Sequence, residues 1–133
     1  MSDQIDRALN FEGNPPSPSP ARKNHLLVIG IDQYQYVGKL SNAVRDAQAI
    51  RDLLLSRYHF EKEQLKEIYN GQATRRNLMK SLRSYLDRLT DKDNLLVYFS
   101  GHGHYDKKIE EAYWVPVDAE YEEVDDYVSY SYL

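Results

Sequence analysis

The residues best suited to chemistry in this chain lie in residues 95–104, which read LLVYFSGHGH. An apolar run typical of a buried strand ends at Ser100, and a histidine between two glycines follows. Histidine exchanges protons near neutral pH, so His102 is a candidate general acid or base. Gly101 and Gly103 let a substrate approach the main chain, and the Gly103 amide could donate to a developing oxyanion. Taken alone, the segment also fits a simple turn in which His102 is solvated.

Two other chemistries at this segment have weaker support. Ser100 is close to His102 in sequence, but the segment lacks the glycine that a nucleophile elbow requires two places before its serine. His102, His104 and Asp106 could chelate zinc, yet no further cluster of ligands stands at a convincing spacing. His59 is expected to pack or to face water. The 133 residues contain no cysteine, which excludes a thiol nucleophile, a disulfide or a thiolate metal site within this chain.

The elements that must position His102 follow from the apolar pattern. Residues 25–31 and 94–100 are short apolar runs, typical of strands covered on both faces, and residues 65–70 are expected to form a short strand. Two segments between them have apolar residues at helical spacing. Residues 42–58 place one such face at Ala43, Ala47, Ile50 and Leu54, and residues 75–89 place another at Leu78, Leu82, Tyr85, Leu86 and Leu89.

This alternation of strands and helices predicts a parallel sheet with helices on its faces. Functional groups in such sheets gather in the loops beyond the carboxyl ends of the strands. The loops after Ile31 and Phe99 should therefore lie at the same edge. Ser41 or Asn42 is expected to cap the first helix, and Thr74 the second, by accepting a bond from an early backbone N–H.

The ends of the chain have patterns of their own. Residues 112–119, AYWVPVDA, resemble a strand, and Pro116 makes it an edge strand or a strand end. Residues 125–133 are expected to open another helix with an aspartate cap, inside which the sequence stops. Residues 1–22 are rich in proline and serine and predict an extended tail or linker, which leaves 23–133 as one domain.

Composition narrows the function classes. The net charge of −4 and the absence of a basic stripe argue against a nucleic-acid partner. No apolar run is long enough to cross a bilayer, and the N-terminus carries acids where a signal peptide would be basic and then apolar. These features predict a cytoplasmic protein with neither a nucleic-acid nor a membrane partner.

Four segments resemble, in order and spacing, the large-subunit half of the caspase and metacaspase family of cysteine endopeptidases: LLVIGIDQY, LSNAVRDAQAIRDLL, LLVYFSGHG and YWVPVDA. The resemblance covers the chain from about residue 24 onward. It implies an α/β fold, a caspase-like sandwich with a central, mainly parallel sheet and flanking helices, here incomplete. It also implies a histidine–cysteine dyad that cleaves peptide bonds, with His102 as the histidine and the Gly103 amide in the oxyanion hole.

The family's cysteine lies in an Asp-x-Cys-x-Gly-like turn after one more helix, a part that this sequence does not contain. The chain is therefore expected to be the large-subunit portion of a catalytic domain, inactive alone. Its open sheet edge predicts association with the cysteine-bearing part or with another protein chain. The alternative is a non-catalytic scaffold or signalling module. A flavodoxin-like nucleotide binder ranks last, because no glycine loop could cradle a phosphate.

The resemblance also bears on specificity. It implies that Asp46 and Ser100 line a pocket for a basic side chain, so that cleavage follows Arg or Lys. Lys39 leaves an acidic preference open, because caspases that select aspartate carry an arginine in this region. Residues 118–126 gather carboxylates, but their spacing matches no EF-hand, and a flexible loop is the simpler interpretation. No cofactor is expected, with calcium activation left open.

Overall fold

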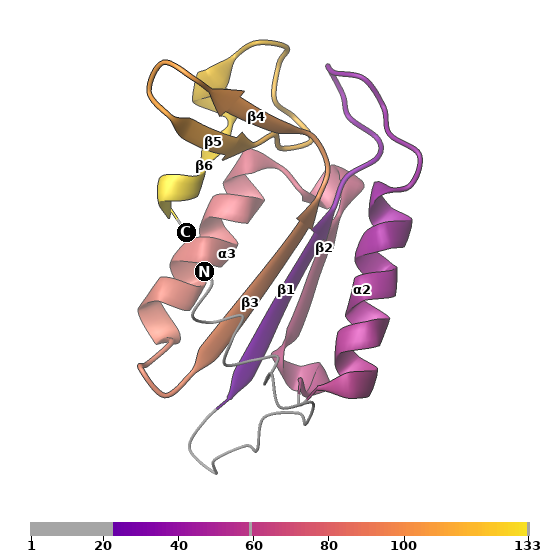
Figure 1. Cartoon of the computed structure of the whole chain (residues 1–133), viewed down its shortest axis with the longest axis vertical. Coiled ribbons are helices and arrows are strands. Elements are labelled where there is room, and N and C mark those ends of the chain that lie inside the picture. Colours follow the sequence, from indigo (N-terminus) through magenta and orange to yellow (C-terminus); the bar gives the residue numbers. More distant parts are fainter. Residues whose placement is uncertain (1–22, 59, 133) are drawn as a thin grey trace.

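The computed structural model describes residues 23–58 and 60–132, and its centre is a parallel sheet (Figure 1). The predicted tail, residues 1–22, and His59 lie outside the described residues. The sheet contains β1 (Asn24–Gly30), β2 (Leu65–Tyr69) and β3 (Asn94–Ser100) in the order β2-β1-β3. All residues of β1 are buried, because strands cover both of its edges and helices both of its faces. The three predicted strands are confirmed.

Two helices cover opposite faces of this sheet, α2 (Ala43–Arg57) and α3 (Arg75–Arg88) (Figure 1). Strand residues alternate between the two faces: Leu26 and Val28 pack with the core under α2, whereas Leu27 and Ile29 pack with the core under α3. The predicted apolar helix faces are confirmed except at Leu86, which is 74% exposed. None of the described helices has the length and apolar character needed to cross a membrane.

The start of α2 differs from the prediction. Asn42 is the N-cap residue, but its side chain makes no capping bond. Asp32, from the loop after β1, instead accepts hydrogen bonds from the backbone amides of Ala43 (2.7 Å) and Val44 (3.3 Å). The expectation of a cap from Ser41 or Asn42 is therefore wrong. A carboxylate supplied by the neighbouring loop satisfies these amides and also complements the positive end of the helix dipole.

The start of α3 agrees with the prediction. The Thr74 hydroxyl accepts a hydrogen bond from the backbone amide of Asn77 at 3.1 Å. Asp118, far along the chain, accepts another from the amide of Arg75 at 3.0 Å. Side chains from loops outside each helix thus help to hold both helices at the carboxyl edge of the sheet.

A small antiparallel sheet lies beyond this edge (Figure 1). It consists of β4 (Gly103–Asp106), β5 (Glu111–Trp114) and β6 (Val128–Ser129) in the order β4-β5-β6. Pro116 follows the end of β5, so the predicted strand end is confirmed.

The helix expected over residues 125–133 is wrong. The chain there forms a 3-10 turn (Val124–Asp126), then β6, then a second 3-10 turn (Tyr130–Tyr132). Val128 pairs with Trp114 and is fully buried. This pairing with a distant strand outweighs any local helical preference, because it removes the Val128 side chain from water.

Candidate active site

His102 lies in the short link between β3 and β4, where the two sheets meet. Its Nε2 atom is 2.6 Å from the carbonyl oxygen of Gly38, in the loop after β1. A carbonyl oxygen only accepts hydrogen bonds, so Nε2 must carry the hydrogen and donate it. In the neutral ring this leaves Nδ1 as the free base. The contact also confirms that the loops after β1 and β3 meet at one edge.

Tyr34 holds the main chain of His102. The backbone amide of His102 donates to the Tyr34 hydroxyl at 2.8 Å, and this hydroxyl donates to the carbonyl of Val115 at 2.9 Å. In the opposite direction, the Val115 amide donates directly to the His102 carbonyl at 3.0 Å. The hydroxyl therefore replaces one of the two hydrogen bonds that would join His102 and Val115 in a regular antiparallel rung.

The surroundings of Tyr34 keep its hydroxyl protonated. Its side chain is 2% exposed, and its ring centroid lies 4.7 Å from that of His102. Burial raises the pKa of Tyr34 to about 12. At neutral pH the hydroxyl is therefore a stable donor to Val115 as well as an acceptor from His102.

The glycines beside His102 have different surroundings. A Cβ on Gly101 would lie 2.6 Å from the Tyr34 hydroxyl oxygen, so the glycine leaves room for that hydroxyl. A Cβ on Gly103 would meet only the carbonyl of Tyr113, at 3.6 Å. Gly103 lies opposite Trp114, one residue beyond the hydrogen-bonded rung. Antiparallel strands direct the amides of such a pair away from each other, so the Gly103 N–H points away from β5.

A cavity of about 210 Å³ opens beside His102. The loop after β1 forms one wall, and the antiparallel sheet with the acidic segment after β5 forms the rest. The residues that line it are Val37, Gly38, His102, Gly103, His104, Val115, Tyr121 and Tyr127. The structure thus brings the imidazole and Gly103 to a common cavity.

Asp46 and Ser100 do not line this cavity. Asp46 is exposed in the first turn of α2, and Ser100 is half-buried at the end of β3, in register with Gly30. Gly30 packs against the start of α2, where a Cβ on the glycine would lie 3.1 Å from the Cβ of Ala47. Side-chain alternation along β3 places Ser100 on this same face of the sheet, toward α2.

No metal centre is formed by the residues that the structure describes. Among residues 23–58 and 60–132, no three side chains of histidine, aspartate or glutamate converge in a way that could hold a metal ion. The ring of His104 instead packs with those of Tyr113 and Tyr127, at centroid distances of 5.9 and 5.5 Å.

Sequence reasoning missed the residues that support the site. Asn70 directly follows β2, at the start of a 3-10 turn, and has a positive φ of 47°. Its side-chain oxygen accepts from the amides of Asp32 (2.8 Å) and Gln33 (3.1 Å), which holds the loop after β1. An asparagine before a glycine is a turn signal that sequence analysis can recognise. The role of Tyr34 has no such signal, because its partners lie far along the chain.

Comparison with known proteins identifies the family of this chain. The model of the caspase domain matches residues 23–130, and the chain belongs to this family of proteases. The particular relatives are metacaspases. The chain is 30% identical to Metacaspase-3 of Arabidopsis thaliana over 97 residues, which cover 66% of this chain and 26% of that protein. It is 26% identical to Metacaspase-1 of Eremothecium gossypii over 83 residues, 58% of this chain and 18% of that protein.

A third relative is Metacaspase-1 of Plasmodium falciparum, with 29% identity over 97 residues that cover 67% of this chain and 16% of that protein. The matched part is thus about a quarter or less of the length of each of these relatives. The caspase-like α/β fold expected from the sequence is confirmed in this incomplete form, with a parallel sheet flanked by helices.

Proposed function

We propose that this chain supplies the histidine-bearing part of a caspase-like cysteine endopeptidase, with the thiol supplied from outside these 133 residues. The observation that carries the proposal is the hydrogen bond from His102 Nε2 to the Gly38 carbonyl, 2.6 Å long. It orients the ring and leaves Nδ1 to accept the thiol proton. The imidazolium formed then returns this proton to the leaving amine, while the Gly38 carbonyl stabilises the ring's positive charge.

The main chain at Gly103 would bind the oxyanion. Attack by the thiolate on a peptide carbonyl places negative charge on the carbonyl oxygen, and a fixed N–H donor lowers the energy of that state. Support comes from the pairing of β4 with β5, which leaves the Gly103 amide directed away from the ladder. The exposed position of Gly103 gives the substrate access to this amide.

A preference for Arg or Lys substrates is proposed from Asp46 and Ser100. Both lie near the carboxyl edge of the sheet on the side of α2, where a carboxylate and a hydroxyl could receive a guanidinium or ammonium group. Lys39 is exposed in the loop after β1 and is the residue that would favour an acidic substrate instead. Peptides with different charges at the cleaved residue separate these two possibilities.

The test combines this chain with a separately produced metacaspase segment that contains the Asp-x-Cys turn. Cleavage of fluorogenic peptides ending in Arg, Lys or Asp is then measured. We expect cleavage after Arg and Lys, with a loss of about 100-fold or more in His102→Ala. Asp46→Asn should raise KM for the Arg peptide, and Lys108→Ala, on an exposed turn, is the control. Cleavage that persists in His102→Ala removes the dyad assignment, and a preference for Asp peptides removes the basic specificity.

The same experiment addresses a non-catalytic role. Among the described residues, the outer edge of β2 has no strand partner, and this open edge is the observation that favours a scaffold acting by association. A scaffold predicts that the cysteine-bearing segment binds this chain without peptide cleavage. Binding is measured separately, by co-purification, so that a failure to associate is distinguished from a failure to catalyse.

A further inference from the structure

Positive charge is concentrated on one helix of an otherwise acidic protein. The whole chain has a net charge of −4. Helix α3 carries one acid, Asp87, against five cations, namely Arg75, Arg76, Lys80, Arg83 and Arg88. This separation of charge gives the α3 side of the sheet an electrostatic character opposite to that of the chain as a whole.

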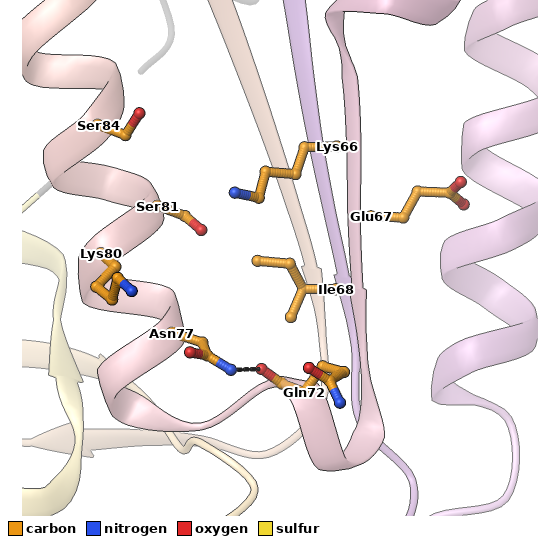
Figure 2. Close-up of a pocket in the computed structure, with 8 residues that line it drawn as sticks. All are labelled: Lys66, Glu67, Ile68, Gln72, Asn77, Lys80, Ser81 and Ser84. Atoms are coloured by element: carbon orange, nitrogen blue, oxygen red, sulfur yellow. Dashed lines mark hydrogen bonds between the residues drawn. The ribbon is translucent and has the colours of Figure 1, made fainter.

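A groove of about 510 Å³ runs between α3 and β2 (Figure 2). The Lys66 side chain extends from β2 toward α3, and the side chains of Ser81 and Ser84 extend from α3 toward it. Lys80 lies on the same helix one residue before Ser81 and also lines the groove. Within the described part of the chain, neither lysine makes an ion pair.

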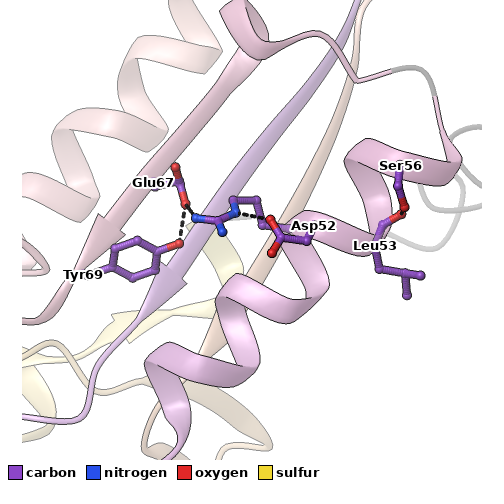
Figure 3. Close-up of polar contacts among 6 residues, drawn as sticks. Asp52, Leu53, Ser56, Glu67 and Tyr69 are labelled. Atoms are coloured by element: carbon purple, nitrogen blue, oxygen red, sulfur yellow. Dashed lines mark hydrogen bonds and ion pairs between the residues drawn. The ribbon is translucent and has the colours of Figure 1, made fainter.

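Among the described residues that line this groove, Glu67 is the one acid, and its carboxylate lies on the other face of β2. Figure 2 shows that Glu67 points away from α3, and Figure 3 shows its polar contacts on the opposite side of β2. The carboxylate accepts from the Arg51 guanidinium at 2.7 Å and from the Tyr69 hydroxyl at 2.5 Å. Arg51 also pairs with Asp52 at 2.8 Å, so its charge is shared between two carboxylates on the α2 side of β2. On the α3 side, the groove presents the charges of Lys66 and Lys80.

The groove lies along an open strand edge. β2 pairs with β1 on one side, and among the described residues no strand pairs with its other side. Every second residue of such an edge directs its N–H and C=O groups outward, where an extended peptide can bind them. The same edge thus offers main-chain hydrogen bonds and, beside them, two lysine side chains.

We propose that this edge binds an extended acidic segment of a partner protein, which adds as a strand next to β2. Residues of an added strand alternate between the two faces of the sheet. Those facing α3 meet Lys66 and Lys80, whereas those between them face Glu67. The site therefore selects acids at every second position over an uninterrupted acidic run. This inference is independent of the proposed function, because it uses neither His102 nor the site around it.

The probe is a fluorescent eight-residue peptide that alternates glutamate and threonine, titrated into the 133-residue chain with anisotropy as the readout. A second peptide has the same composition, with its four glutamates consecutive. We expect the alternating peptide to bind more tightly, and Lys66→Glu/Lys80→Glu to weaken it by about tenfold. Backbone NMR shifts should change at residues 65–69. Lys66→Gln/Lys80→Gln should weaken binding by a smaller factor, which keeps the test valid if the double reversal does not fold.

Lys107→Glu/Lys108→Glu is the matched control, because it changes the net charge equally at the exposed turn between β4 and β5. We expect it to bind like the unmodified chain. The proposal would be overturned if both double variants weakened binding equally, or if the two peptides bound equally well. Either result would show non-specific electrostatic attraction without the addition of a strand. Displacement of the peptide by a short single-stranded oligonucleotide that binds more tightly would also overturn it, in favour of a nucleic-acid surface.

Discussion

Replacing Tyr34 with Phe should loosen the support of His102 without opening a cavity. The Tyr34→Phe change removes only the hydroxyl that accepts from the His102 amide and donates to the Val115 carbonyl. Because Tyr34 is 2% exposed, water cannot readily replace that hydroxyl. Each hydrogen bond lost from a buried site costs about 1 kcal/mol, so we expect a loss of about 2 kcal/mol in the free energy of unfolding.

Urea denaturation followed by circular dichroism measures this free energy directly, and a thermal melt should show Tm lower by roughly 10 °C for a domain of this size. Hydrogen exchange reports the local effect. The backbone amide of His102 should exchange faster in Tyr34→Phe, because it has lost its acceptor. The exchange rates of amides in the centre of β1 should change only as much as the loss of global stability requires.

Tyr36→Phe is the matched control. It removes the same atom from the same loop, but the Tyr36 side chain is 58% exposed, so its loss should cost less than about 0.5 kcal/mol. If Tyr34→Phe is no more destabilising than Tyr36→Phe, the bridging hydroxyl contributes nothing. A direct hydrogen bond from the His102 amide to the Val115 carbonyl would then explain the result. Tyr34 would not be the residue that holds His102 in position.

Three further predictions concern the framework. Asp32→Ala should cost about 1 to 2 kcal/mol, because two amides at the start of α2 lose their acceptor. Burial lowers the pKa of His25 below its ordinary value of 6.5, so the unfolded chain binds this proton more readily. Stability should therefore be complete above about pH 6.5 and fall as the pH drops, by at most about 1.4 kcal/mol per pH unit from this group. Gly30→Ala should cost about 1 to 3 kcal/mol, because the added Cβ lies 3.1 Å from the Cα of Val44.

Denaturant titrations provide the measurements, each with its own control. Ser41→Ala should leave stability unchanged, and a loss equal to that of Asp32→Ala would restore Ser41 as the cap. The free energy of unfolding, measured between pH 7.5 and 5.5, should depend less on pH in His25→Asn. An unchanged pH dependence would assign it to another group. Gly71→Ala adds a Cβ with nothing within 4 Å and should be nearly neutral, so equal losses at Gly30 and Gly71 would exclude steric packing as the cause.

The sequence alone was sufficient for the parallel sheet and its helices. Both signals are local: β1 and β3 are continuous apolar runs, and α3 has its apolar residues at helical spacing on one face. The same reasoning failed at residues 125–132, where a segment rich in tyrosine forms two 3-10 turns and a short strand. The decisive contact there is the pairing of Val128 with Trp114, and no local pattern indicates a partner so far away.

For the candidate site, the sequence by itself determined the chemical groups and the edge at which they meet. The glycines around His102 and the parallel topology were enough to bring the loops after β1 and β3 together. Only the tertiary structure decided how the imidazole is held: by the carbonyl of Gly38, which sets the hydrogen on Nε2, and by the hydroxyl of Tyr34, which completes a rung of the β4–β5 ladder. These bonds join residues more than sixty positions apart, and their directions depend on packing that residue types and spacing do not encode.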